Sequence, residues 1–327
     1  MNNFKKLFFT IISLVLLLCS CNSPKKIPVI FDTDANNELD DQHALAYLLY
    51  NASVFDIKGI TVNTTYNGGN IDEQYAEAKR VMQLCDWEDK TPLLKGANGS
   101  FEEIKNTLDT LDYDGNKAVD FIIKEAKKYT KEKLVVIAVG KLTNVALAVQ
   151  KEPSIIDNIR LVWLGSNYPD PGEYNLVNDI PSMNYLLETA IDFEMVTVRY
   201  GQPSGTDFVK LTKEEVVANM PKLGKTIATS VIGRHGGEFN TFGAYSMSLF
   251  DHATFHGDPA TRSLFDMAAV AIVKNPTWAK CSEIPAPIMV DKEWVERANN
   301  PRSIKLWENF DKELIMTDFY QSLNVEN

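Results

Sequence analysis

Five acidic residues lie within ten positions near the start of the chain, directly after an apolar run. They are Asp32, Asp34, Glu38, Asp40 and Asp41. Carboxylates crowded at one strand end repel each other strongly unless a positive charge lies among them. A hard cation with oxygen ligands removes that repulsion, and calcium accepts several carboxylates in irregular geometry. The segment therefore predicts a cation site built from carboxylates.

A simpler interpretation covers part of this cluster. Asp40 and Asp41 have the position of acids at a helix N-terminus, where they cap the helix and face its dipole. That interpretation does not account for Asp32 and Asp34, which continue a strand expected to be buried. The first pair is therefore the stronger sign of a bound cation.

The elements that position these acids follow from an alternation of two patterns. Short apolar runs predict strands over residues 27–31, 55–62, 134–139, 161–164 and 193–199. Amphipathic stretches predict helices over residues 41–50, 73–84, 144–150 and 183–190. This alternation is typical of an α/β fold with a mainly parallel, Rossmann-like open sheet and helices on both faces. Ligands of such folds bind at the carboxyl ends of the strands, so the residues after each strand are the candidates for function.

Four segments at these places resemble, in order, the motifs of the inosine-uridine preferring nucleoside hydrolase family. They are Asp32-x-Asp34 with Asp40-Asp41, Gly140-Lys141-Leu142-Thr143-Asn144, Asn167 with Glu173-Tyr174-Asn175, and Phe265-Asp266 before an apolar stretch. Singly, each also suits a helix N-cap or a polar loop. Jointly they imply the nucleoside hydrolase fold for residues 28–327. They also imply calcium-dependent hydrolysis of the N-glycosidic bond of ribonucleosides, or of a related N-riboside, to free base and ribose.

The resemblance also implies roles for individual residues. The implied calcium ligands are Asp34, Asp41, Asp266 and the main-chain carbonyl of Thr143, with Asp34 also the general base. The implied substrate-binding residues are Asp40, Asn167, Glu173, Asn175 and an asparagine after the second strand, which is Asn67, Asn63 or Asn70. Such side chains suit a sugar, because hydrogen bonds to its hydroxyl groups strengthen as charge develops at the anomeric carbon.

The chain departs from the family pattern before Asp266, where well-known members have a histidine that protonates the departing base. This chain has Phe265, which has no proton to donate. Candidate replacements, most of them in a stretch expected to lie over the base, are His43, His235, His252 and His256 as donors and Phe239, Phe242 and Tyr245 as stacking partners. The competing interpretation is that these are ordinary loop residues. Lys141 also replaces a proline, and the Asp-Asp pair lies about two residues later than in the family.

Three alternatives stay open. A haloacid-dehalogenase-type phosphatase would use Asp32 as its nucleophile with magnesium. A non-catalytic nucleoside-binding lipoprotein is favoured by Phe265 but disfavoured by the complete set of implied calcium ligands. A changed N-riboside substrate within the family is also compatible with Phe265.

The N-terminus predicts export. Lys5 and Lys6 precede an apolar run over residues 7–18, and Leu18-Cys19-Ser20-Cys21 resembles a bacterial lipobox. We therefore predict a lipoprotein signal peptide over residues 1–20, lipidation of Cys21, a tether over 21–27 and a catalytic domain over 28–327. The predicted location is the periplasm or cell surface, with the membrane contacted through the lipid anchor only.

The composition limits the partners. A net charge of −11 argues against nucleic acid or an anionic membrane surface as a partner. We expect a small nucleoside or N-riboside, consistent with purine or pyrimidine salvage, and leave open whether the chain forms a homo-oligomer.

Overall fold

An eight-stranded sheet forms the centre of the computed structural model, which describes residues 25–37 and 39–324. The predicted signal peptide and Cys21 lie outside these residues. The strands are, in spatial order, β11 (Lys280–Pro285), β14 (Ser303–Glu308), β6 (Asp192–Thr197), β5 (Ile159–Ser166), β4 (Leu134–Ala138), β1 (Ile27–Thr33), β2 (Phe55–Val62) and β3 (Leu93–Lys95). All neighbours pair in parallel except β11, which is antiparallel to β14.

Side chains that alternate along the strands bury both faces of this sheet. In β1, Val29 and Phe31 pack into one apolar core, whereas Ile30 packs into the other. In β4, Ile137 and Val136 divide in the same way. Because successive strand residues point to opposite faces, such strands need cover on both sides.

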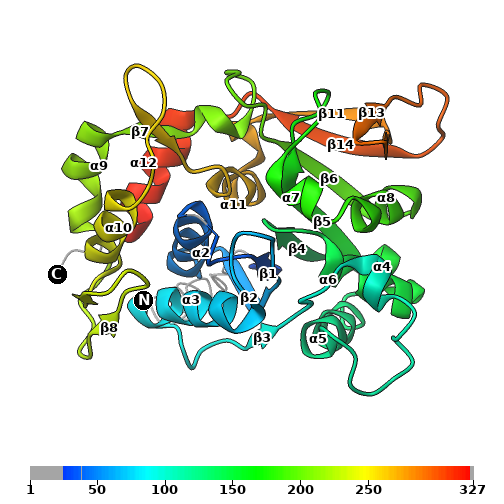
Figure 1. Ribbon diagram of the computed structural model, residues 1–327, viewed down its shortest axis with the longest axis horizontal. Helices are drawn as coiled ribbons and strands as arrows, with labels where there is room; N and C mark the ends of the chain where they lie inside the picture. The colour runs from blue at the N-terminus through cyan, green and yellow to red at the C-terminus, as the bar shows by residue number, and fades with distance from the viewer. Residues whose placement is uncertain (1–24, 38, 325–327) are drawn as a thin grey trace, which may run out of the picture.

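Helices supply that cover (Figure 1). The first core contains residues of α2 (Asp40–Tyr50), α3 (Ile71–Leu84), α9 (Lys213–Asn219), α10 (Phe242–Asp251), α11 (Met267–Lys274) and α12 (Lys312–Leu323). The second contains residues of α4 (Phe101–Ile104), α5 (Asn116–Ala126), α6 (Thr143–Lys151) and α8 (Ile180–Glu188). The short α7 (Tyr174–Asn178) follows β5. The predicted α/β class with a mainly parallel sheet is therefore confirmed.

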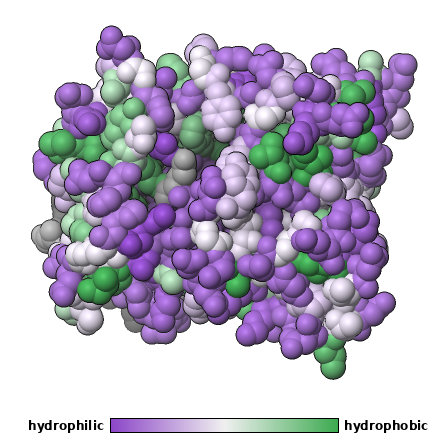
Figure 2. All heavy atoms as spheres, in the orientation of Figure 1, coloured by the Kyte–Doolittle hydropathy of each residue, from purple (hydrophilic) through white to green (hydrophobic). Residues whose placement is uncertain are grey.

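Smaller elements add to this framework. The short strands β7 (Lys210–Thr212) and β10 (Thr261–Ser263) pair antiparallel, and we call this pair the β7–β10 ribbon. Two further short pairs are β8 (Val231–Ile232) with β9 (Glu238–Phe239), and β12 (Ile288–Val290) with β13 (Glu293–Val295). On the face drawn in Figure 2 the surface is mostly hydrophilic, with hydrophobic residues in separate groups. No described helix has both the length and the apolar character needed to cross a bilayer.

Candidate active site

The carboxyl ends of four neighbouring strands meet at one edge of the sheet. The amide of Asn63 donates to the carbonyl of Thr33 at 3.0 Å, and the amide of Val139 donates to that of Asp32 at 2.8 Å. A cavity of about 700 Å³ lies at this edge. Its acidic and amide lining residues are Asp34, Asn37, Asp40, Asp41, Glu173, Asn175, Asp207, Asp258 and Asp266. The structure therefore brings together seven residues that the sequence placed in or near the site: Asp34, Asp40, Asp41, Glu173, Asn175, Phe265 and Asp266.

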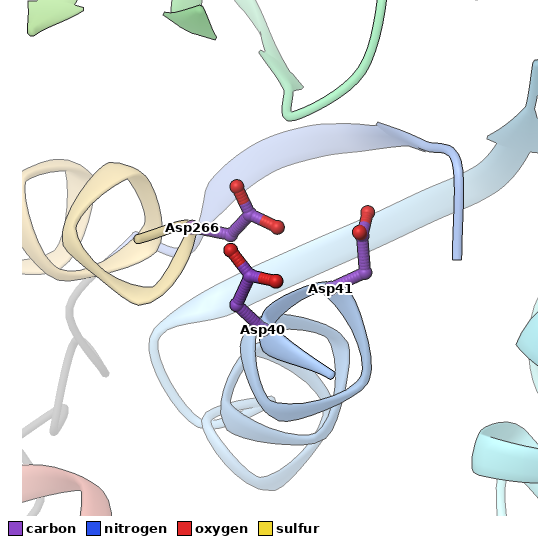
Figure 3. A group of neighbouring side chains, drawn as sticks. All are labelled: Asp40, Asp41 and Asp266. Atoms are coloured by element: carbon purple, nitrogen blue, oxygen red, sulfur yellow. The ribbon is translucent and has the colours of Figure 1, made fainter. Parts of the chain in front are cut away.

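Three buried carboxylates from two helices form a tight group in this cavity. Asp40 and Asp41 are the first residues of α2, and Asp266 directly precedes α11. One oxygen from each lies within 4.8 Å of the other two, and Figure 3 shows the three side chains converging. Asp266, the N-cap residue of α11, makes no side-chain cap hydrogen bond to that helix. Helix capping, the simpler interpretation, therefore does not account for the convergence.

Asp34 completes the acidic group and is also buried. Its Oδ2 accepts a hydrogen bond from the hydroxyl of Thr65 at 2.7 Å, and the hydroxyl of Thr33 donates to Asp41. Burial raises the pKa of Asp34 and of Asp40 to about 7, and neighbouring carboxylates add to that rise. Burial followed by the same mutual repulsion raises the pKa of Asp41 and Asp266 well above the usual range. The fold therefore holds four acids where their negative charge is unfavourable.

This donor set fits a hard divalent cation. Its members are oxygen ligands only, without the cysteine sulfur or histidine nitrogen that zinc and the softer metals prefer. A cation among them would also offset the repulsion that raises their pKa values. Asp34, Asp41 and Asp266, with Asp40 beside them, would hold it.

Glu173 and Asn175 line the same cavity from the start of α7. The carboxylate of Glu173 accepts from the amides of Asn175 and Leu176, at 3.0 and 2.9 Å, and burial raises its pKa to about 7. The side-chain amide of Asn175 donates to the carbonyls of Val139 and Leu164, at 2.7 and 3.1 Å. Both side chains are thus fixed by backbone groups, as recognition of a sugar diol requires.

The comparisons with known proteins agree with this geometry. The family model described as inosine-uridine preferring nucleoside hydrolase matches residues 29–317. This chain belongs to that family. A non-specific ribonucleoside hydrolase, RihC, of Klebsiella pneumoniae is 22% identical over 274 residues, 77% of this chain and 80% of the relative. As the motifs predicted, this chain is a hydrolase that acts on N-glycosyl bonds. The family to which it belongs is metal-dependent.

Solved structures share the fold. A plant nucleoside hydrolase has a TM-score of 0.70 at 16% identity, covering 92% of this chain and 100% of that one. A purine-preferring ribonucleoside hydrolase from Gardnerella vaginalis has a TM-score of 0.68 at 19% identity, covering 91% and 98%. These likenesses support the nucleoside hydrolase fold that the motifs implied.

The lining of the cavity favours another main-chain ligand than the one that the family resemblance implied. Thr143 is the buried first residue of α6, its hydroxyl donates to Asp179, and it is not among the residues that line the cavity. The main chain that reaches the acids lies earlier in the turn, at Val139 and Gly140. Val139 lines the cavity, and a Cβ on Gly140 would lie 2.8 Å from Oδ1 of Asp34. The Val139 carbonyl therefore replaces that of Thr143 as the candidate ligand.

Several asparagines implied for ribose binding have other contacts. Asn63 is buried behind the cavity, where it donates to Asp32 at 2.9 Å, and Asn67 is exposed in a turn. Asn70 caps α3, and Asn167 joins the carbonyl of Pro171 to the amide of Tyr200. None of these four asparagines lines the cavity. Their implied contact with ribose is therefore not seen; Asn63, beside Asp34, lies nearest to the acids.

Asp32 has a structural role in this family member. Its two carboxylate oxygens accept from Thr61 at 2.5 Å, Asn144 at 2.7 Å and Asn63. It does not line the cavity, although burial raises its pKa to about 6. Because donors surround the carboxylate, the structure gives no support to Asp32 as the nucleophile of a phosphatase.

The candidate replacements for a histidine before Asp266 lie in different places. His256 lines the cavity at an exposed position. His235 and His252 stack on each other, with ring centroids 4.1 Å apart, and do not line it. His43 is buried, with its ring bonded to the carbonyl of Leu39 and the hydroxyl of Ser246. The candidate stacking residues Phe239, Phe242 and Tyr245 pack in or against the apolar core instead.

Sequence reasoning missed Tyr200, Lys210 and Arg262, all of which line the cavity. The ring of Tyr200 meets that of Phe265 edge-on, with centroids 5.8 Å apart. The place of Arg262 four residues before Asp266 was the available signal for it. The sequence contained no signal for Lys210, because a three-residue strand is too short to show a hydrophobic periodicity.

Proposed function

We propose that this hydrolase cleaves the N-glycosidic bond of ribonucleosides, or of a related N-riboside, in a calcium-dependent reaction that gives free base and ribose. The observation that carries the proposal is the convergence of Asp34, Asp40, Asp41 and Asp266 in one cavity with Glu173. One relative is a non-specific ribonucleoside hydrolase and another a purine-preferring ribonucleoside hydrolase, and both support this substrate class.

Calcium is the cation proposed for this site. The residues that would hold it are Asp34, Asp41, Asp266 and the Val139 carbonyl, a mixture of carboxylate and main-chain oxygens that suits calcium. When bound, such a cation would orient a water molecule and lower its pKa. The acids themselves carry the rest of the chemistry.

In the proposed mechanism Asp34 accepts the proton of the attacking water as general base. The water oxygen bonds to the anomeric carbon while the C–N bond breaks through an oxocarbenium-like state. Asp40 and Glu173 present negative oxygens to the sugar as positive charge develops on it, and Asn175, whose amide donates to two backbone carbonyls, lines the same cavity. Glu173 is held by two backbone amides, so it does not have to reorganise during the reaction.

The test is ribose release by the soluble form that begins after Cys21. Purine, pyrimidine and nicotinamide ribosides are compared with calcium and with a chelator, for the wild type and for Asp34→Ala. Asp109→Asn, which changes an exposed acid far from the cavity lining, is the matched control. Calcium-dependent release that Asp34→Ala removes and Asp109→Asn retains supports the proposal. Tight riboside binding without release would instead identify a nucleoside-binding protein.

We also propose that the enzyme is a lipoprotein anchored through Cys21 on the periplasmic or outer surface of the cell. The support is the basic, apolar and small-residue order of residues 5–21. Incorporation of a radiolabelled fatty acid tests it, with Cys21→Ser as the control. A labelled wild type beside an unlabelled Cys21→Ser protein fits the proposal, whereas an unlabelled wild type contradicts it.

A further inference from the structure

The cavity has a second chemical surface that the proposed mechanism does not use. Lys210 and Arg262 line it from the two strands of the β7–β10 ribbon. Among the described lining residues these are the only lysine and arginine. The acids come from elsewhere, namely the sheet edge and the starts of α2, α7 and α11. The ribbon thus places two permanent positive charges on a wall that joins the acidic site.

The ribbon fixes Arg262 in a mostly dry position. Arg262 is 9% exposed and pairs across the ribbon with Leu211, whose side chain lies in the apolar core. It lies four residues before Asp266, whose charge attracts it. A guanidinium held in a poorly hydrated wall acts on nearby charge far more strongly than one in water.

Lys210 is half-buried and faces the same cavity. It pairs across the ribbon with Ser263, whose hydroxyl donates to Asp207 at 2.6 Å. The other oxygen of Asp207 accepts from the amide of Gly201 at 2.7 Å. Within residues 25–37 and 39–324 the Lys210 ammonium makes no hydrogen bond or ion pair, so its charge is available to a ligand of the cavity.

Cleavage of a C–N bond leaves an electron pair on the departing nitrogen, which must be protonated or stabilised. Phe265 has no proton to donate. Tyr200 lies against Phe265, but burial raises the pKa of its hydroxyl and makes it a weaker acid. The other proton donors in the lining include Tyr174, whose pKa burial also raises, and His256, which is exposed. The cations of the ribbon are better placed to stabilise the charge than these groups are to remove it.

We propose that Arg262, assisted by Lys210, stabilises the leaving base as an anion in place of a proton donor. The inference rests on the proposed hydrolase function. The water oxygen bonds to the anomeric carbon and its proton goes to Asp34. The C–N electron pair goes to the nitrogen, and the base departs as an anion beside the guanidinium and later takes a proton from solvent. The preferred substrates are therefore ribosides of bases that form anions readily, such as hypoxanthine or uracil, rather than cytosine.

The test compares two substrates that differ in how much stabilisation their leaving groups need. Hypoxanthine, released from inosine, is a poorer leaving group than 4-nitrophenolate, which is stable as an anion without help from the protein. Arg262→Met should lower kcat for inosine by about 10²- to 10³-fold and kcat for the nitrophenyl riboside by less than about threefold. Lys210→Met should show the same selectivity with a loss of about tenfold, and Arg262→Lys should restore part of the inosine rate.

Controls separate this role from others. Lys213→Met removes a neighbouring cation that lies over Phe255 and not in the cavity lining, so both rates should be retained. Equal losses on both substrates in Arg262→Met would overturn the inference and make Arg262 a structural residue. A selective inosine loss in His256→Gln but not in Arg262→Met would overturn it in favour of a histidine acid. A wild type that cleaves neither substrate overturns the hydrolase function itself.

Discussion

The pKa of the buried carboxylate Glu194 and those of the acids at the sheet edge shift in opposite directions. Glu194 in β6 is fully buried, and it accepts two hydrogen bonds from Arg160, at 2.8 and 3.0 Å, and one each from Lys305 and Trp307, both at 2.8 Å. Burial alone would raise its pKa, but the hydrogen bonds and charge of Arg160 and Lys305 outweigh burial and lower it. Asp34, Asp41 and Asp266 are equally buried, but repulsion among acids adds to burial and raises their pKa values.

The difference separates a structural from a functional use of buried charge. The partners of Glu194 come from β5 and β14, the two strands beside β6, so its contacts join three strands of the sheet. The acids at the sheet edge keep oxygens directed at a cavity, at a cost to the free energy of folding. Substitution of Glu194 should therefore affect stability, whereas substitution of the acids at the sheet edge should affect activity.

The largest expected effect is that of Asp266→Asn on activity. Losing one of the converging carboxylates should lower calcium-dependent ribose release by about 10³-fold. In a chelator the same variant should unfold at the same or a higher temperature than the wild type, because one repelling charge is gone. Ribose release measured beside thermal unfolding checks both results. A variant that is inactive because its metal-free form is strongly destabilised would contradict this assignment.

Glu194→Ala should have the converse effect. It leaves the half-buried guanidinium of Arg160 without its carboxylate and should lower the free energy of unfolding by about 3 kcal/mol. Denaturant unfolding of the metal-free protein measures the loss. At a temperature where both proteins are folded, ribose release per folded molecule should stay within about twofold of the wild type, since surplus stability is separable from activity. A large drop in kcat without a loss of stability would show that the two groups are coupled.

Calcium should stabilise the wild type by binding to the acids at the sheet edge. At a concentration about 100 times its Kd, a ligand that binds only the native state adds about 2.7 kcal/mol, equivalent to a rise in Tm of about 5 °C. The rise should persist in Glu194→Ala and disappear in Asp266→Asn. Differential scanning calorimetry with calcium and with chelator is the measurement. An equal rise in Asp266→Asn would place the cation elsewhere.

The sequence predicted the elements that carry local patterns. Residues 55–62 were predicted as a strand with the bounds that β2 has, and the helix predicted over 144–150 lies within α6. Asp34 was found because it follows a strand expected to be buried, and Asp266 because its segment follows the other family motifs in order. The main-chain ligand implied at Thr143 stays a prediction, because the motif marks the turn but not which carbonyl faces the acids. Only the approach of Gly140 to Asp34 decides that point.

The sequence did not predict which strands distant along the chain pair with each other. β14 lies beside β6 through pairs such as Lys305 with Glu194, which no local period indicates. The β7–β10 ribbon joins two three-residue strands separated by almost 50 positions, and it brings Lys210 and Arg262 to the cavity. The family resemblance placed the stretch 234–258 over the base. Of its histidines, His256 lines the cavity, whereas the stacked His235 and His252 do not.

The smallest expected effect is the pH dependence of stability in the metal-free protein. The pKa of Asp34 rises from 3.8 to about 7 in the folded state, so the native state binds the extra proton between these values. Stability from this residue is therefore complete at low pH and is lost as the pH rises toward 7. For Glu194, whose pKa is lowered, stability is instead lost as the pH falls.

Asp34→Asn isolates the first of these contributions. In a chelator, the free energy of unfolding of the wild type relative to Asp34→Asn should fall by roughly 2 kcal/mol between pH 4 and pH 7. Denaturant titrations at several pH values measure that difference, with Asp109→Asn as the control that should show no such trend. A difference that grows in favour of the wild type as the pH rises would mean that Asp34 is paired with a positive group, as Glu194 is. The contrast between the two groups of carboxylates would then no longer hold.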